Sequence, residues 1–395
     1  MERLLRFPTD PRHPCGGFAY LDAFGRPVTE EPVHTWITGR MTHVYALAHL
    51  CGLPGASDLV DHGVAALRDL LHDHQEGGWF SAVRPDGTPS DRKDAYQHAF
   101  VVLGASSAAA AERPGARSLL DAALEVFETR FWDEAAGRFV ESFARDWTDG
   151  EPYRGANSNM HAVEVSLAAG DVTGDVRWHD RALRIATALI HGVAREHRWR
   201  VVEHFDATWE PLLEYNHDQR DHPFRPYGTT VGHWLEWSRL LLHLEASLAD
   251  PPDWLLPAAQ ALFQAAIDLG WAPDGSPGFV YTLDRDDRPV VDTRLHWVVA
   301  EGIAAAASLH ERTAESVYER WYRRLWDHAE VAFIDRQNGS WHHELDPDLR
   351  VAQGTWGGKP DLYHAVQATL LPQLALAPSI ATQLAGHATS SRNEP

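Results

Sequence analysis

Cysteine is almost absent from this chain of 395 residues, which contains only Cys15 and Cys51. Two cysteines cannot build a disulfide framework or a cysteine metal site. Positive charge is also scarce, since 35 Lys and Arg residues face 56 Asp and Glu residues and leave a net charge of −21. Nucleic acids and anionic membranes both attract basic surfaces, so neither is an expected partner.

Long hydrophobic runs are missing as well. No stretch of about 18 apolar residues is available to cross a bilayer. The first residues, MERLLRFPTDPRHP, lack the apolar core of a signal peptide. We therefore expect a reduced, soluble, cytoplasmic protein. The P-loop, the dinucleotide motif G-x-G-x-x-G and the nucleophile elbow G-x-S-x-G are absent too.

The remaining composition is that of an ordinary globular protein, with 44% hydrophobic and 23% charged residues. Sixteen Trp and 24 His residues are unusual. Aromatic walls and titratable imidazoles suit a small polar ligand with a flat face, such as a sugar, although Trp is also a common core residue.

One polar side chain recurs near the start of each of six apolar helical segments, and five of the six are histidines. Successive positions are separated by 58, 63, 72, 63 and 68 residues, a period that indicates one structural unit repeated six times. If the six helices form a ring, these side chains point toward a common centre and define a binding site: Arg40, His98, His161, His233, His296 and His364.

Each unit combines a short hairpin with helices. Alternating aromatic or β-branched residues around a turn predict hairpins within 16–27, 77–89, 137–150, 199–211, 276–289 and 339–350. Apolar residues at helical spacing predict a first helix over roughly 33–51, 94–111, 157–169, 228–248, 292–310 and 361–372. A second helix follows five of them, over 56–73, 115–131, 175–195, 253–270 and 313–331, and the sixth partner is expected from 374–386 with a contribution from 1–7.

Six helical hairpins in a closed ring form an all-α (α/α)6 barrel, with short β-hairpins on one face. An open α-solenoid is the alternative. A closed ring is favoured over an open solenoid because there are six repeats and the polar residue lies at the same point of each repeat. Small residues in 101–111 and 300–309 permit close packing in an inner ring. We predict a single catalytic domain over 1–386 and a disordered tail over 387–395.

His233 and Glu236 lie three residues apart and therefore on one face of the fourth inner helix. A carboxylate beside an imidazole orients it and raises its basicity, as a general base near pH 7 requires. A purely structural pair is the alternative. His161 and Glu164 repeat this spacing on the third inner helix. Each pair can act without a metal, although a metal site built from scattered His and Glu residues stays open at this point.

Asn157 stands one turn before His161, where it can cap the helix, face the cavity, or do both. His364 follows the cap-like Asp361 on the last inner helix. A lone histidine on an apolar helix usually belongs to the core. In the predicted ring, however, the helix of His364 lies two inner helices away from that of His233, so that the two imidazoles can flank a bound small molecule.

The other ring positions suit binding better than proton transfer. Arg40 is always cationic and cannot act as a base near neutrality. His98 and His296 are weaker candidates, with packing as the alternative, and the histidines at 72, 74, 342 and 343 are expected to be solvated. Aromatic and acidic neighbours of the ring can contact a sugar or pack in the core: Tyr96, Trp297, Glu301 and Trp356.

Three segments together resemble the N-acylglucosamine 2-epimerase superfamily: YRGANSNMHAVEV (153–165), FRPYGTTVGHWLEWSRLLL (224–242) and KPDLYHAVQATLLP (359–372). The combination of N-x-N-M-H-x-x-E with G-H-x-x-E-W is most similar to its branch of bacterial mannose and sulfoquinovose isomerases. The resemblance covers about 30–375. It implies an (α/α)6 barrel that interconverts free sugars without a redox cofactor or an essential metal.

The resemblance also implies roles for individual residues. The two catalytic histidines of the family fall on His233 and His364, and the glutamate after the first falls on Glu236. The implied reaction interconverts D-mannose and D-fructose, and by extension D-lyxose and D-xylulose, by histidine-mediated proton transfer through a cis-enediol(ate). The sugar-binding positions of the family fall on Arg40, Tyr96, Asn157, His161 and Trp297.

Other functions stay open. A 2-epimerase of N-acylglucosamine or of a cellobiose-like disaccharide, or a sulfoquinovose isomerase, fits the same resemblance. An (α/α)6 glycoside hydrolase needs two carboxylic acids flanking the bond, whereas histidines dominate this ring. A non-catalytic sugar-binding protein would bind mannose without exchanging its C2 proton. The expected partner is a small monosaccharide, and the chain is expected to be a monomer or a homodimer. Which histidine opens the sugar ring is not decided by the sequence.

Overall fold

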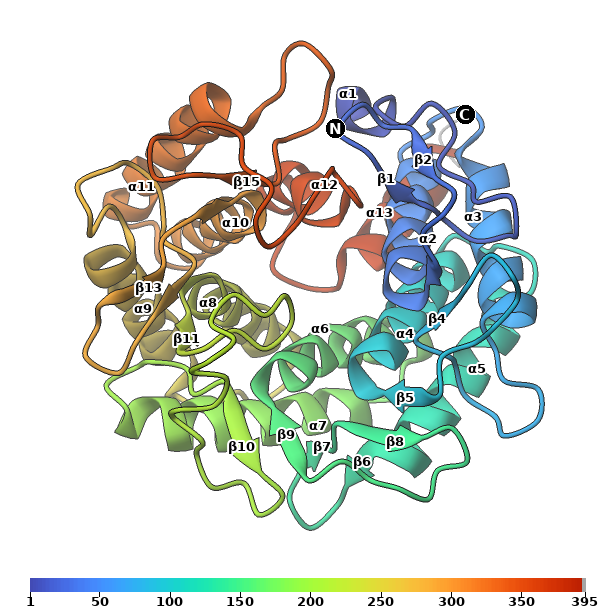
Figure 1. The fold of residues 1–395 in the computed structure, drawn as a ribbon, viewed down its shortest axis with the longest axis horizontal. Coiled ribbons are helices and arrows are strands. Elements are labelled where there is room, and N and C mark those ends of the chain that lie inside the picture. The colour runs from blue at the N-terminus through green and yellow to red at the C-terminus, as the bar shows by residue number, and fades with distance from the viewer. Residues whose placement is uncertain (393–395) are drawn as a thin grey trace.

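The chain runs once around a ring and places six helices along its centre (Figure 1). The structure is a computed structural model and describes residues 1–392. Each inner helix begins close to its predicted start. In the described residues the inner helices are α2 (Thr35–Leu50), α4 (Ala95–Ala110), α6 (Ala156–Thr173), α8 (Val231–Ser247), α10 (His296–Thr313) and α12 (Tyr363–Leu370).

Five outer helices pack against the inner helices that precede them in the chain: α3 (Ala56–Ala65), α5 (Ala116–Val126), α7 (Arg177–Ala186), α9 (Leu255–Ala265) and α11 (Ser316–His328). Each continues into a wider π-helical turn, over Ala66–Leu70, Phe127–Phe131, Thr187–Ala194, Ala266–Gly270 and Ala329–Phe333. The outer helices bury one apolar face and expose the other, as a surface layer does. The predicted all-α (α/α)6 architecture is thereby confirmed.

Inner helices are buried on nearly all sides, which requires small residues where they cross. A Cβ on Gly39 of α2 would lie 2.3 Å from the backbone oxygen of Phe100 in α4. A Cβ on Gly104 of α4 would lie 2.8 Å from the oxygen of Gly39. The two backbones can therefore approach this closely only because both positions are glycine.

Short antiparallel strands form a belt at the end of the barrel where the inner helices begin. Two pairs are local hairpins close to predicted positions: β1 (Tyr20–Leu21) with β2 (Pro27–Val28), and β12 (Thr282–Leu283) with β13 (Pro289–Val291). β6 (Trp132–Asp133) and β7 (Arg138–Phe139) form a local hairpin that was not predicted, just before the one expected within 137–150. The others join the residues before an inner helix to the hairpin of the next repeat: β3 (Val33–His34) with β4 (Ala82–Val83), β5 (Arg92–Asp94) with β8 (Ser142–Ala144), β9 (Tyr153–Gly155) with β10 (His204–Asp206), β11 (Thr229–Thr230) with β12, and β14 (Arg294–Leu295) with β15 (Glu344–Leu345).

The ring closes where the last repeat meets the first. α12 lies beside α2, red next to blue in Figure 1. The backbone N–H of Lys359 donates to the carbonyl of Leu21 at 3.0 Å. The buried Lys359 ammonium also lies 2.8 Å from Asp335 Oδ2, so one residue holds both sides of the seam.

The C-terminal helix α13 (Ile380–Arg392) packs against α2, α4 and α6. The partner expected from 374–386 therefore covers the far end of the barrel, and a short helix α1 (Glu2–Leu5) begins the chain. α13 continues through the start of the tail predicted at 387, while 393–395 lie outside the described residues. Across residues 1–392, no helix has both the length and the apolar character needed to span a membrane.

Candidate active site

The belt end of the barrel contains a cavity of about 700 Å³, to which every inner helix contributes residues from its first turns. We call it the N-terminal cavity. Because the inner helices all begin here, their dipoles favour negative charge at this end of the barrel. Most predicted site residues line it, with His98 and Glu301 as the exceptions: Arg40, Tyr96, Asn157, His161, His233, Glu236, His296, Trp297, Trp356 and His364.

His233 is held by a glutamate that the sequence did not reveal. Its Nδ1 lies 2.9 Å from Oε2 and 3.0 Å from Oε1 of Glu203, a buried residue beside β10. The expectation that Glu236 orients His233 is wrong, because the Glu236 carboxyl lies beside Arg239 and His161 instead. Because Nδ1 faces the Glu203 carboxylate, Nδ1 is the donor of this hydrogen bond, and Nε2 is the ring nitrogen turned toward the cavity.

A repeated hairpin position supplies this glutamate. The first residue of each of five inner helices donates its backbone N–H to the carbonyl of one residue in the next repeat's hairpin. Each such residue stands two positions after a buried Trp, Phe or Val of the hairpin, a spacing readable in the sequence. The five equivalent positions are Ser81, Glu141, Glu203, Tyr281 and His343.

His364 forms a second histidine–glutamate pair. Its Nδ1 lies 2.9 Å from Oε1 of Glu301, which comes from the neighbouring helix α10. Burial lowers the pKa of His364, and the Glu301 anion opposes that shift. The ring is therefore neutral at pH 7 and its Nε2 is a free base. Glu301 was predicted to bind substrate, but it lies beneath His364 and does not line the cavity.

Glu236 is a buried carboxyl whose surroundings raise its pKa. Burial raises its pKa well above the usual value, and the nearby Glu301 and Glu164 carboxylates raise it further. The Arg239 guanidinium, 3.5 Å from Oε1, opposes this only in part. Glu236 therefore lines the cavity as a carboxyl whose surroundings favour its acid form, the reverse of the basicity-raising anion predicted from the sequence.

A layer of charged side chains lies beneath the cavity floor. Arg239 Nε donates to Glu301 Oε2 at 3.0 Å, so this arginine keeps the partner of His364 ionised. Glu164 accepts from the Tyr363 hydroxyl, and His161 Nδ1 lies 3.3 Å from the same oxygen. Burial lowers the pKa of His161 to about 4, which leaves this ring neutral.

Arg40 is a fixed cation at the cavity wall. It pairs with Asp361 at 3.2 Å and donates to the Tyr96 hydroxyl at 3.1 Å. Its guanidinium also lies 4.7 Å from the centre of the Tyr363 ring. Asp361 in turn accepts the backbone N–H of Tyr363, which fixes the start of α12 beside Arg40. Arg40 is thus held close to His364 and available to a developing oxyanion.

Aromatic rings form the side and the mouth of the cavity. The Trp297 ring centre lies 5.4 Å from that of His233 and 5.6 Å from that of His364, so the indole touches both imidazoles. At the mouth, Trp356 packs edge-on against Phe224 and Trp36. These rings give the cavity flat aromatic walls.

The remaining predicted residues divide between cavity and core. Asn157 lines the cavity as the second residue of α6, and Gly155 occupies the cap position. His98 lies outside the cavity, where Nε2 accepts the backbone N–H of Trp79. His296 lines the cavity and stacks on His343 at 3.7 Å. The expectation that His343 is solvated is wrong, because it is buried.

One trio of side chains has the spacing of a metal site. Ligand atoms of His161, Glu164 and Glu236 lie within 4.8 Å of one another. One feature of this donor set opposes a cation: the Arg239 guanidinium lies 3.5 Å from Oε1 of Glu236, so a positive charge already stands against the trio.

Comparison with known proteins agrees with this geometry. The sequence model described as N-acylglucosamine 2-epimerase (GlcNAc 2-epimerase) matches residues 16–368. A protein of Thermobifida fusca named D-mannose isomerase is 60% identical over 385 residues, which are 97% of this chain and 95% of that protein. A D-mannose isomerase of Pseudomonas cannabina pv. alisalensis is 52% identical over 374 residues, 94% of this chain and 90% of its own.

A solved structure is similar over the same length. The crystal structure of a D-mannose isomerase superposes with a TM-score of 0.88 at 28% identity, and the match covers 94% of this chain and 95% of that one. The similarity therefore includes both the ring of helices and the belt of strands that surround the N-terminal cavity.

Proposed function

The chain belongs to the N-acylglucosamine 2-epimerase family, and from that premise we infer that it is an aldose–ketose isomerase that interconverts D-mannose and D-fructose. The single observation that carries this function is the pair of buried histidine–glutamate dyads, His233–Glu203 and His364–Glu301, that contact one tryptophan in one cavity. The isomerisation needs groups that accept protons, a group that donates one and a positive charge near the oxyanion. In this proposal the two histidines are the bases, Glu236 is the acid and Arg40 is the cation.

The sugar ring opens first, because only the open aldehyde makes the C2 proton acidic. We propose that His233 Nε2 accepts the proton of the anomeric hydroxyl while the neutral Glu236 carboxyl protonates the ring oxygen. Both side chains come from α8 and face the same cavity. The C1–O5 bond breaks and the C1 carbonyl forms, which is acid–base catalysis with no net proton change.

His364 then removes the C2 proton. Arg40 is the cation beside it and, together with the helix N-termini, stabilises the negative charge of the cis-enediolate. Return of the proton from His364 to C1 on the same face, with a hydroxyl proton moving from O2 to O1, gives the ketose. Delivery to C2 from the opposite face would give the 2-epimer and requires a second carbon acid–base.

The substrate range and setting follow from the same cavity. We propose that D-lyxose and D-xylulose are also interconverted, since they match D-mannose and D-fructose at the reacting carbons. Asn157, His161, Tyr96, Trp297 and Trp356 contact the sugar in this proposal. A cytoplasmic location and a monomeric or homodimeric state stay predictions.

Product analysis tests the function. Purified protein incubated with D-mannose should produce D-fructose, and incubation with D-fructose should produce D-mannose, each resolved from D-glucose by chromatography. Formation of D-glucose as the main initial product would show a 2-epimerase instead. Absence of any product, with D-mannose still bound, would contradict enzymatic function altogether.

A further inference from the structure

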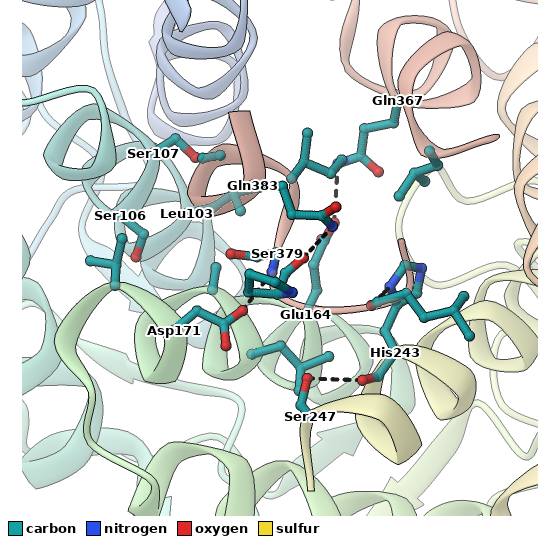
Figure 2. Close-up of a pocket in the computed structure, with 18 of the residues that line it drawn as sticks. Leu103, Ser106, Ser107, Glu164, Asp171, His243, Ser247, Gln367, Ser379 and Gln383 are labelled. Atoms are coloured by element: carbon teal, nitrogen blue, oxygen red, sulfur yellow. Dashed lines mark hydrogen bonds between the residues drawn. The ribbon is translucent and has the colours of Figure 1, made fainter. Parts of the chain in front are cut away.

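A second cavity lies at the opposite end of the barrel, where the inner helices end (Figure 2). Its volume is about 660 Å³, close to that of the N-terminal cavity, and we call it the C-terminal cavity. The segment 374–381 and the start of α13 cover it. Two side chains fasten this cover: Asp171 accepts the backbone N–H of Ser379 at 2.6 Å, and His243 Nδ1 lies 2.6 Å from the Leu376 carbonyl.

Three residues that line the C-terminal cavity carry buried polar atoms without a hydrogen-bond partner among the described residues: Ser106 Oγ, Gln367 Oε1 and His243 Nε2. Ser106 and Gln367 are 1% and 2% exposed. Figure 2 shows the three side chains around the same space. A buried polar atom that stays unpaired costs free energy, so a site with three of them favours a guest that pairs with them.

The chemistry of these atoms defines the guest. Burial lowers the pKa of His243 to about 4, so its ring is neutral, and because Nδ1–H donates to Leu376, Nε2 is an acceptor. The Gln367 amide donates to Glu164 at 3.1 Å, which leaves its carbonyl oxygen as a second acceptor. Two acceptors and the Ser106 hydroxyl require a guest with several O–H donors.

The charge and the shape of the C-terminal cavity narrow the chemical class of the guest further. Glu164 and Asp171 repel an anion, and Arg239 is already paired with Glu301. The remaining walls are apolar and suit C–H groups: Leu103, Leu167, Leu240 and Leu371. We propose that the C-terminal cavity is a second binding site, for a small neutral polyol.

The second site is connected to the first by hydrogen bonds. Gln367 bonds to Glu164, and Glu164 lies 3.3 Å from the ring of His161, which lines the N-terminal cavity. A guest on the Gln367 carbonyl therefore fixes the orientation of an amide that holds this carboxylate. Polyol binding should change catalysis without competing with the sugar substrate.

Calorimetry with erythritol tests the proposal on the full chain and needs no catalytic activity, so its failure is distinct from failure of the proposed function. Ser106→Val should weaken erythritol binding about tenfold or more, because it removes one hydroxyl contact and adds a methyl group to the cavity. Ser166→Val is the matched control: Ser166 is also buried and without a partner in the described residues, one inner helix away, but it does not line the cavity.

The expected result is saturable binding that persists with saturating D-mannose, is lost in Ser106→Val and is kept in Ser166→Val. Displacement of erythritol by D-mannose, or equal affinity in the two variants, would overturn the proposal. If Ser106→Val does not fold, crystals of the unaltered protein grown with erythritol decide: erythritol density in the C-terminal cavity supports the proposal, and water alone there overturns it.

Discussion

At the scale of single residues, the site depends on which nitrogen of each imidazole faces the sugar. His233 and His364, the two proposed bases, each have Nδ1 bound to a glutamate from another element, which leaves Nε2 to face the sugar in the proposed reaction. Sequence spacing identified the histidines correctly as cavity residues but assigned the glutamate of His233 to the wrong element. Side-chain partners across elements depend on the strand register, which local periodicity does not encode.

Replacement of Glu203 by Gln should reduce kcat/KM for D-mannose about 100-fold, because an amide no longer fixes the Nδ1–H form of His233. Steady-state kinetics measure this. Glu141→Gln is a matched control, since Glu141 occupies the equivalent hairpin position but holds the Gly155 N–H and the Ser158 hydroxyl. Equal loss in the two variants would mean that the position matters for folding alone.

Glu236 gives the reaction its expected pH dependence. Its acid form is active and its pKa is raised, so activity should fall as the pH rises through that value. His364 must be unprotonated and its pKa is lowered, so the acid-side loss should lie below pH 6.5. In pH–rate profiles, Glu236→Gln should lower kcat about 100-fold and remove the alkaline limb. An unchanged alkaline limb in that variant would assign the limb to another group.

At the scale of elements, the sequence predicted the inner and outer helices well because their apolar periodicity is strong. It also located the hairpins, from aromatic alternation around Gly, Asp and Pro turns. It did not predict that β3, β5, β9, β11 and β14 each pair with the following repeat, since such pairing is decided in three dimensions. The position of α13 was not predicted either. The sequence indicated a helix after α12, but whether that helix packs on the outside of the barrel or across its end is also decided in three dimensions.

Where the inner helices cross, the addition of a single methyl group should lower the stability of the protein. Gly39→Ala should destabilise the protein by about 2 kcal/mol or more, because the new Cβ would lie 2.3 Å from the Phe100 carbonyl oxygen. Urea unfolding measures the change. Gly386→Ala in α13 is the matched control: its Cβ would meet none of the described atoms outside its own helix turn within 4 Å, so helix propensity should make it neutral or stabilising. Equal effects would contradict the close packing of α2 on α4.

At the scale of the whole molecule, the ring shape brings residues from 40 to 364 into one cavity and leaves a second at its other end. The repeat period predicted the closed ring and the first cavity. The second could not be foreseen, because it depends on how the segment after α12 folds over the helix ends. Both depend on closure between the last and first repeats.

Substitution of Lys359 tests how the segment that closes the ring is held. Lys359→Met should destabilise the protein by about 3 kcal/mol or more, because it leaves the buried Asp335 carboxylate without its cation. Arg336→Met is the control. It removes only an exposed ion pair with Glu330 and should change stability by less than about 1 kcal/mol. Thermal unfolding of both variants measures the difference. Similar melting temperatures would mean that the Lys359–Asp335 pair contributes little to the stability of the segment that closes the ring.

The most direct test of the account follows the C2 proton itself. D-Mannose is incubated in deuterated water with the unaltered protein and with His364→Gln, and proton NMR records the products. The account predicts D-fructose from the unaltered protein, formed with transfer between C2 and C1 or with deuterium at C1, and neither product nor C2 exchange from His364→Gln. Undiminished C2 exchange in His364→Gln, or deuterated D-glucose from the unaltered protein, would contradict it.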